Sequence, residues 1–319
     1  MKKIFAMLLA LVMVLSMVAC QPSNAPTTPT DSSKPADNTS TPADPGTTGG
    51  SNSMAVCLAS EPDTIDPALN SAVDGATLLA HLFSGLAKWS QDANGALVIA
   101  PDAAEELVEG VMNDDGTVSY TYTLREGMKW SDGKDVTASD FVFAWKRSAS
   151  EELGADYGYM FEVVKGYPND LAISAPDDRT FEVTLTNTVA YWNELLAFPT
   201  FFPVREDVVS NEAWATDAST YIGNGAYKMT DWVHNSVIVL DKNPDFFDAS
   251  LVTMDRIEFY LSDDANNMLT NFENGSWALI DDVPTNEIAN LKEKYPTEFY
   301  VVGQIGTYYV CWNINEEIL

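Results

Sequence analysis

Residues 125–141, REGMKWSDGKDVTASDF, contain a turn followed directly by the start of a helix. The turn is predicted at residues 131–133, because Asp and Gly favour tight turns. Thr137 is then the N-cap, and Asp140 completes a short-acid version of the capping box. A hydrophobic staple and the buried face of the helix that follows are predicted from Val136, Phe141, Ala144, Trp145 and Ser148.

Outward from this stretch, apolar or alternating segments are interspersed with segments of helical periodicity. The predicted strands are residues 54–58, 118–124, 181–185, 237–240 and 277–280. The predicted helices are residues 78–86 with Gly85 as C-cap, 268–272 ended by Gly275, and a last helix capped by Thr285 and stopped by Pro296. Strands and helices mix along the chain without an internal repeat, which favours the α/β class.

The composition excludes several classes of function. The chain has 319 residues, 46% of them hydrophobic, and a net charge of −30. The length favours about two domains. Nucleic-acid binding needs clustered Lys and Arg, so the charge argues against it and against a basic membrane-surface helix. The three cysteines form no CxxC pair and the two histidines no HExxH motif, so we expect neither a metal site nor a cofactor.

The first 19 residues are predicted to be an export signal. Two lysines precede an apolar run from Ile4 to Met17, which at about 14 residues is short for a membrane span. The run leads into a sequence that resembles the bacterial lipoprotein signal, so we expect lipidation of Cys20. Met17 departs from the usual Leu, and an ordinary secretory signal with an incidental Cys is the alternative. Residues 20–53, rich in Pro, Ser and Thr, are predicted to be a disordered tether.

Four stretches recur together, in this order and spacing, in one known family. They are residues 61–67 (EPDTIDP), 125–141, 224–232 (with NGAY and DW) and 242–257 (with KNPDFF and MDRI). Through them, residues 54–319 resemble the bacterial extracellular solute-binding proteins of family 5, the oligopeptide-binding lipoproteins of ABC importers. The lipoprotein signal and the tether agree with this resemblance independently.

The resemblance implies an α/β fold of the periplasmic-binding-protein-like type II class (cluster C). Lobe I is expected over residues 54–84 and 206–306, and a smaller domain II is expected as an insertion at 85–205. The start of lobe III is expected at residues 307–319. Because the resemblance implies a longer lobe III, we interpret the chain as a C-terminally truncated member that lacks most of this lobe. A shorter complete architecture is the alternative.

The resemblance also implies a function. It predicts a monomeric substrate-binding lipoprotein, not an enzyme, that captures oligopeptides outside the cell and delivers them to the permease subunits of an ABC transporter. The protein would sit on the outer face of the cytoplasmic membrane, at the cell surface or in the periplasm, with the lipid anchor as its only membrane contact. Such proteins close on an extended peptide by a hinge motion and hold it through main-chain hydrogen bonds.

By position, the resemblance assigns ligand contacts to five residues. They are Ser71, Ala72, Val73, Tyr157 and Phe198. Each has a structural alternative, since Val73 also fits a helix entry and Tyr157 a surface aromatic in a loop. The aspartate that usually fixes the peptide amino group belongs to lobe III, so no anchor is named, and negligible peptide affinity is expected for residues 54–319 alone.

Other ligands are the nearest rivals, because relatives that resemble this chain carry dipeptides, nickel chelates, haem or small sugars. A hydrolase of the Ser-x-x-Lys type is a further alternative, suggested by Ser131 and Lys134. The Asp-Gly between them favours a turn, whereas that nucleophile needs a helix start. The Asp281-Asp282 pair is interpreted as a solvated turn rather than an acid/base pair.

Several other residues are interpreted as structural. Trp130 is expected to pack in the core or between domains, and Gly225 to satisfy a backbone turn. His81 is expected at the boundary of a helix. A disulfide between Cys57 and Cys311 is open for an exported protein, but we expect two buried thiols.

Overall fold

The computed structural model describes residues 52–303, 307 and 309–312. The predicted export signal, the lipidated Cys20 and nearly all of the predicted tether lie outside the described residues. Among the described residues, no helix combines the length and the apolarity that a membrane span requires.

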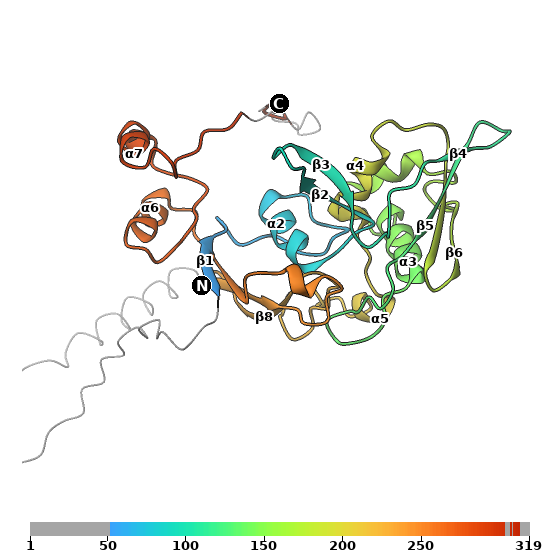
Figure 1. The fold of residues 1–319 in the computed structure, drawn as a ribbon, viewed down its shortest axis with the longest axis horizontal. Helices are drawn as coiled ribbons and strands as arrows, with labels where there is room; N and C mark the ends of the chain where they lie inside the picture. The colour runs from blue at the N-terminus through green and yellow to red at the C-terminus, as the bar shows by residue number, and fades with distance from the viewer. Residues whose placement is uncertain (1–51, 304–306, 308, 313–319) are drawn as a thin grey trace, which may run out of the picture. The chain divides into compact units, whose positions relative to one another are not determined.

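The first strand, β1 (Ser53–Cys57), pairs with β10 (Arg256–Tyr260), which lies some two hundred residues later in the chain. A four-stranded sheet has the order β1-β10-β9-β8, with β1 parallel to β10 and the other pairs antiparallel. Figure 1 shows β1 in blue beside the orange strands of the same sheet. The strands are β1 (Ser53–Cys57), β8 (Tyr227–Val233), β9 (Val237–Lys242) and β10 (Arg256–Tyr260).

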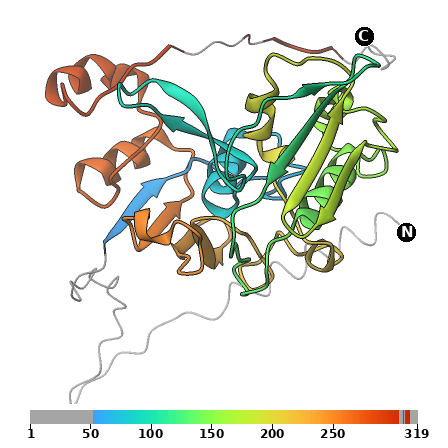
Figure 2. The same cartoon turned by 45° about the vertical axis from the view of Figure 1, so that its right-hand side comes forward.

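A second, antiparallel sheet is formed entirely from the middle of the chain, in the order β4-β5-β7-β6. The helix α3 (Ala138–Ala149) packs against β6 and β7, and Figure 2 shows it along one face of this sheet. The strands are β4 (Val111–Met112), β5 (Val118–Thr123), β6 (Ile173–Asp177) and β7 (Thr180–Leu185). A separate hairpin consists of β2 (Ala87–Gln91) and β3 (Leu97–Pro101).

Short helices connect and cover these sheets. The helix α2 (Val73–Leu82) buries Leu78, Leu79 and Leu82, and it packs against β8 and against the 3₁₀ turn η2 (Pro199–Phe201). The remaining elements are η1 (Gly158–Val163), α4 (Trp192–Leu196), α5 (Glu206–Val209), η3 (Ala249–Leu251), α6 (Ala265–Glu273), η4 (Thr285–Glu287) and α7 (Ile288–Lys294).

The start of α3 confirms the local prediction from the sequence. The Asp140 carboxylate accepts a hydrogen bond from the Thr137 backbone N–H at 2.8 Å, as the capping box requires. The two staple residues, Val136 and Phe141, are both buried. On the same helix, Trp145 is fully buried, and its indole N–H donates to the Phe201 carbonyl at 2.8 Å. The helix is thereby fixed to η2 as well as to its own sheet.

Three element predictions are wrong. Residues 277–280 form no strand, because only one parallel bridge joins Leu279 to Val56, and the segment then leaves the edge of β1. Gly85 is not the C-cap of α2, which ends at Leu82. Instead, a Cβ at Gly85 would lie 2.6 Å from the Phe202 ring, so close packing requires glycine there. Thr285 begins the turn η4, and α7 starts only after it.

The cysteine prediction is confirmed for one residue and wrong for the other. Cys57 is a buried free thiol, and burial raises its pKa. Cys311 is a free thiol that is exposed, because the described residues around it make no packed element.

Candidate functional site

Ser71, Ala72 and Val73 form an exposed stretch of backbone at the entry to α2. Val73 is 82% exposed, and the other two are also exposed. Among the described residues, no protein acceptor is found for the backbone N–H groups of these three residues. Because the first N–H groups of a helix lack intrahelical partners, they are available to a ligand.

The Ala72 carbonyl is occupied. It accepts hydrogen bonds from the Ala76 N–H at 3.1 Å and from the buried Asn70 side-chain amide at 3.0 Å. The Asn70 bond fixes the backbone just before the helix. Ser71–Val73 therefore offers a ligand mainly hydrogen-bond donors, the backbone N–H groups.

A buried ion pair holds the loop that leads into this stretch. Both carboxylate oxygens of Asp66 accept from the Arg147 guanidinium, at 3.0 and 2.6 Å, and Asp66 also accepts from the Ala68 N–H at 3.0 Å. The side chain of Asp66 is 4% exposed and that of Arg147 is 16% exposed. Next to this pair, the Tyr221 hydroxyl donates to the Ile65 carbonyl at 2.7 Å. The loop is thus tied to α3.

Tyr157 and Phe198 lie against each other. Their ring centroids are 5.0 Å apart and the rings are nearly perpendicular, at 87°. Tyr157 precedes η1 and Phe198 precedes η2, and both side chains are half-buried. The helix α2 packs against η2, which Phe198 precedes, but no hydrogen bond among the described residues joins the aromatic pair to Ser71–Val73.

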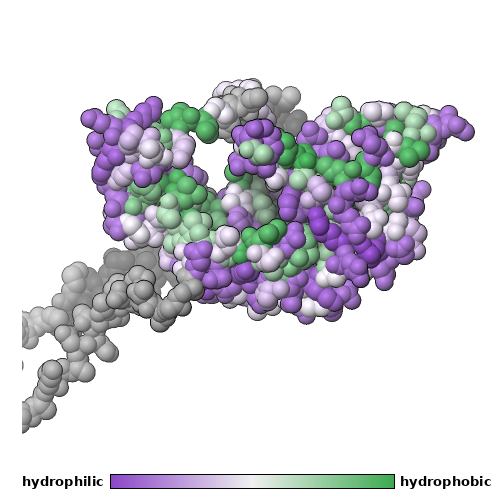
Figure 3. Space-filling view, viewed as in Figure 1, coloured by the Kyte–Doolittle hydropathy of each residue, from purple (hydrophilic) through white to green (hydrophobic). Residues whose placement is uncertain are grey.

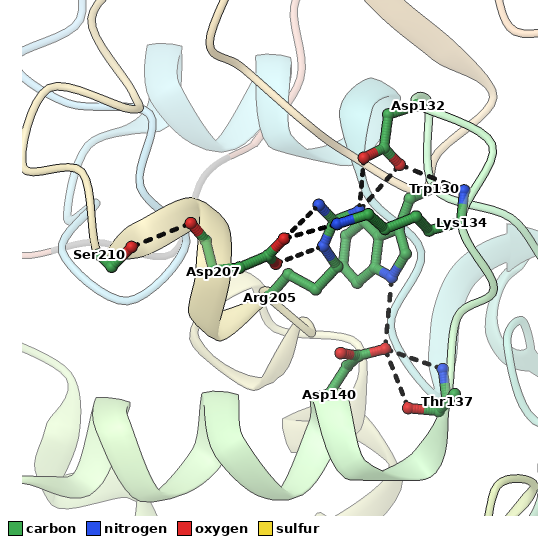
Figure 4. Close-up of polar contacts among 8 residues, drawn as sticks. All are labelled: Trp130, Asp132, Lys134, Thr137, Asp140, Arg205, Asp207 and Ser210. Carbon is green, nitrogen blue, oxygen red and sulfur yellow. Dashed lines mark hydrogen bonds and ion pairs between the residues drawn. The ribbon is translucent and has the colours of Figure 1, made fainter.

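Arg205 holds residues 130–134, the turn that precedes α3 (Figure 4). One guanidinium nitrogen of Arg205 lies 2.8 Å from both carboxylate oxygens of Asp132, and the other two donate to Asp207 at 2.7 and 2.9 Å. The guanidinium also lies over the ring of Trp130, 5.9 Å from its centroid. Lys134 donates to the same Asp207 at 2.7 Å. The predicted structural role of Trp130 is confirmed, since its side chain is fully buried.

The pKa values around Arg205 follow from these contacts. Hydrogen bonds from Arg205 and then Lys134 hold the pKa of Asp207 well below its usual range. Burial raises the pKa of Asp140, and hydrogen bonds from Thr137 and Trp130 only partly oppose this effect. The charged groups of Arg205, Lys134, Asp132 and Asp207 are therefore bonded to one another, which favours a structural role for these residues.

A second group of contacts joins the sequence motifs to the end of α2. Asn224 is buried, and its side chain both accepts from the Ser84 N–H at 2.9 Å and donates to the Ser84 carbonyl at 3.0 Å. A Cβ on Gly225 would lie 2.4 Å from the backbone of Leu82, so glycine is required by close approach rather than by a turn. The Ser131 N–H donates to the Gly223 carbonyl at 2.8 Å. The motifs thus meet at the point where the chain leaves α2.

The residues of the hydrolase alternative are not arranged for that chemistry. Ser131 lies in a turn rather than at a helix start, and the Lys134 amine is paired with Asp207. Asp281 and Asp282 are exposed outside any helix or strand. Within the described part of the chain, no group of three or more His, Cys, Asp or Glu side chains is placed to hold a metal ion.

None of four pockets in the described part of the chain is lined by the five predicted ligand residues. One of about 520 Å³ is formed by α6, α7 and residues 278–283, and Figure 3 shows hydrophobic surface between these two helices. Another, of about 420 Å³, lies beside the loop that carries Glu61. Sequence reasoning missed the partners of this loop, Arg147 for Asp66 and His234 for Glu61, because these contacts span many tens of residues.

The sequence of this chain is similar to a family of known proteins. Residues 98–319 match the family model described as bacterial extracellular solute-binding proteins, family 5 Middle. The oligopeptide-binding protein OppA of Bacillus subtilis is 30% identical over 286 residues, which are 85% of this chain and 50% of that protein. The dipeptide-binding protein DppE of the same organism is 31% identical, over 86% of this chain and 50% of that protein. The chain spans about half the length of the curated relatives it matches.

Among solved structures, Haemophilus influenzae OppA in complex with the peptide RPPGFSPFR is similar, with a TM-score of 0.69 and 27% identity. The superposition covers 78% of this chain and 49% of that chain. This similarity confirms the predicted α/β fold of the periplasmic-binding-protein-like class.

Proposed function

The chain belongs to family 5 of the bacterial extracellular solute-binding proteins, and we propose that it captures oligopeptides outside the cell for an ABC importer. The observation that carries this proposal is the similarity to oligopeptide-binding relatives over most of the chain, at 30% identity to Bacillus subtilis OppA. The similar Haemophilus influenzae structure holds a peptide of nine residues, RPPGFSPFR, which supports peptides longer than two residues as the ligand class.

The exposed backbone at Ser71–Val73 supports main-chain recognition. Its free N–H groups suit the carbonyl oxygens of an extended peptide, and such hydrogen bonds are independent of the peptide's side chains. The half-buried pair Tyr157 and Phe198 offers apolar surface for a peptide side chain. In this proposal, Asp66 and Asn70 hold the backbone in place without touching the peptide.

The domain arrangement is part of the same proposal. We assign residues 54–84 and 206–306 to lobe I, and residues 85–205 to an inserted domain II. The assignment is supported by the sheets, because one combines β1 with strands β8 to β10 and the other is formed within residues 111–185. Lobe III would begin within residues 307–319.

Export and anchoring complete the proposal. The protein would be lipidated at Cys20, tethered by residues 20–53 to the outer face of the membrane, and would act as a monomer with permease subunits. Membership of an extracellular family supports export. A Cys20→Ser variant that still fractionates with membranes would contradict the anchor.

A dipeptide is the second candidate ligand. The specific support for it is DppE, a dipeptide-binding protein that is 31% identical to this chain. The two candidates differ in the length of main chain that they present to Ser71–Val73, so a competition experiment separates them.

Photo-crosslinking of the full chain tests the proposed function, because it detects weak as well as tight binding. An oligopeptide with one photoreactive side chain is irradiated with the protein, and labelled residues are mapped by mass spectrometry. We expect labelling near residues 71–73, 157 and 198 that an unlabelled oligopeptide suppresses. Labelling that is spread over the surface and resists competition would contradict the proposal, and suppression by dipeptides alone would favour the second candidate.

A further inference from the structure

Both ring nitrogens of His234 face hydrogen-bond acceptors. Nδ1 lies 2.8 Å from a carboxylate oxygen of Glu61, and Nε2 lies 3.1 Å from the Thr216 carbonyl oxygen. A neutral imidazole has one N–H and can satisfy only one of these acceptors, whereas the imidazolium donates to both. The geometry therefore fits the protonated ring.

The Glu61 carboxylate accepts hydrogen bonds from two further groups near His234. It accepts from the Trp232 indole N–H at 2.8 Å and from the Asn235 backbone N–H, besides His234. The Trp232 ring lies 4.6 Å from the His234 ring, centroid to centroid. The contact joins three segments: the loop that begins at Glu61, the turn between β8 and β9, and the segment that contains Thr216.

The charges around His234 are mainly negative. Glu61 and Asp217 act directly on the ring. Asp63, Asp66 and Glu212 line the pocket of about 420 Å³ that His234 also lines. Of these carboxylates, Asp66 is neutralised by Arg147. The remaining carboxylates favour a positive charge on the ring.

We propose that His234 is a proton-dependent clasp: the imidazolium ties the Glu61 loop to the β8–β9 turn and to the Thr216 segment, and loss of its proton releases one of the two bonds. The inference goes beyond peptide capture and stands on these contacts alone. Its consequence for the molecule is that the loop leading to Ser71–Val73 is held more firmly at acidic than at alkaline pH.

The direction of the pH effect follows from two pKa shifts. The hydrogen bond to Glu61 holds the pKa of His234 above its ordinary value of 6.5. The clasp's stabilisation from this group is thus complete below pH 6.5 and is lost as the pH rises through the raised pKa.

Burial acts to raise the pKa of Glu61, but the hydrogen bonds from Asn235, His234 and Trp232 outweigh it and leave the pKa below the ordinary 4.5. The contribution of this carboxylate is complete above pH 4.5 and is lost as the pH falls through the lowered pKa. The clasp is therefore firmest between about pH 4.5 and pH 6.5.

An NMR titration of the full chain, labelled with ¹³C in histidine, tests the protonation directly. The sequence contains only His81 and His234, and a His234→Gln variant assigns the signals. We expect the His234 midpoint above 6.5 in the wild type, and lower in Glu61→Gln. His81, whose pKa burial lowers, should titrate below 6.5. If both histidines of the wild type titrate at or below 6.5, the clasp is disproved without need of any variant.

Hydrogen exchange tests the consequence for the loop. At pH 6, the His234→Gln variant should exchange amides of residues 61–70 several-fold faster than the wild type, and at pH 8.5 the difference should be much smaller, because the neutral ring keeps only one of its two bonds. Lys292→Gln serves as the control, because it removes a positive charge from an exposed residue for which no ion pair is described. A difference that is equal at both pH values, or that the control reproduces, would overturn the proposal.

Discussion

The rings of Tyr157 and Phe198 meet edge to face, with centroids 5.0 Å apart and planes at 87°. The two residues are separated in the chain by η1, β6, β7 and α4, and the resemblance assigned a ligand contact to each of them by position. Their contact means that a ligand side chain would meet one joint apolar surface instead of two separate rings. Aromatic pairs in this geometry contribute about 0.5–1.5 kcal/mol beyond the area that they bury.

Replacing either ring should therefore weaken peptide capture in a coupled manner. Tyr157→Ala and Phe198→Ala are each expected to lower competed photo-crosslinking several-fold, and the double variant should lose less than the product of the two effects. Tyr191→Ala is the matched control, because Tyr191 is 55% exposed and belongs to a different helix entry. Equal losses in all three single variants would argue against a role of the pair.

Removing the Asp66 carboxylate should destabilise the protein strongly. Asp66→Ala leaves the Arg147 guanidinium, which is 16% exposed, without its partner, and breaking such a pair costs about 3–5 kcal/mol. The free energy of unfolding in urea measures this cost. As the control, Lys165→Met breaks the exposed pair of Lys165 and Asp115, where a loss of at most about 1 kcal/mol is expected. Similar losses of unfolding free energy in the two variants would show that the buried pair stabilises the protein no more than the exposed one.

Glycine at 225 should be far less replaceable than glycine in an open turn. In Gly225→Ala the new Cβ would lie 2.4 and 2.5 Å from backbone atoms of Leu82 and His81, which cannot rotate away. We expect a loss of about 3 kcal/mol, the upper end of overpacking effects. Gly116→Ala, at φ +84 with nothing within 4 Å, should cost about 1 kcal/mol from the left-handed backbone alone. Urea unfolding curves of both variants measure the difference, and equal losses would contradict the close packing.

The Arg205 cluster should contribute to stability against acid. Because hydrogen bonds from Arg205 and Lys134 lower the pKa of folded Asp207, its contribution is complete above the ordinary pKa of 3.8 and is lost as the pH falls through the lowered value. Asp207→Asn should thus shift acid unfolding, followed by circular dichroism, to higher pH. Asp114→Asn replaces an exposed carboxylate for which no ion pair is described, and it should leave the curve unchanged. An unshifted curve for Asp207→Asn would show that this pair adds nothing.

Local rules predicted the elements that depend on neighbouring residues. The N-cap at Thr137 and the strand from Val118 follow from side chains a few positions apart, and both were confirmed. The strand at 277–280 was wrong because a strand needs a partner along its length, and the edge of β1 offers Leu279 only one bridge. Periodicity carries no information about such a partner.

The contacts that shape the candidate site could not be predicted in this manner. Arg205 and Asp132 are 73 positions apart, and Asp66 and Arg147 are 81 apart, so nothing local relates their charges. The resemblance to a family supplied the fold and the candidate ligand residues by position. It did not indicate that Asn70 fixes the Ala72 carbonyl or that His234 bridges two acceptors, because these depend on side-chain geometry.

The central claim is that Ser71–Val73 receives the main chain of an oligopeptide. Amide exchange of these residues in the full chain tests it most directly. Because weak binding is expected of this chain, exchange is measured without peptide and with oligopeptide raised until competed photo-crosslinking no longer increases. The account predicts that peptide slows exchange at Ser71, Ala72 and Val73, while the exposed turn at Gly116 is unaffected. Unchanged exchange at all three amides, with protection elsewhere on the chain or nowhere, would contradict it.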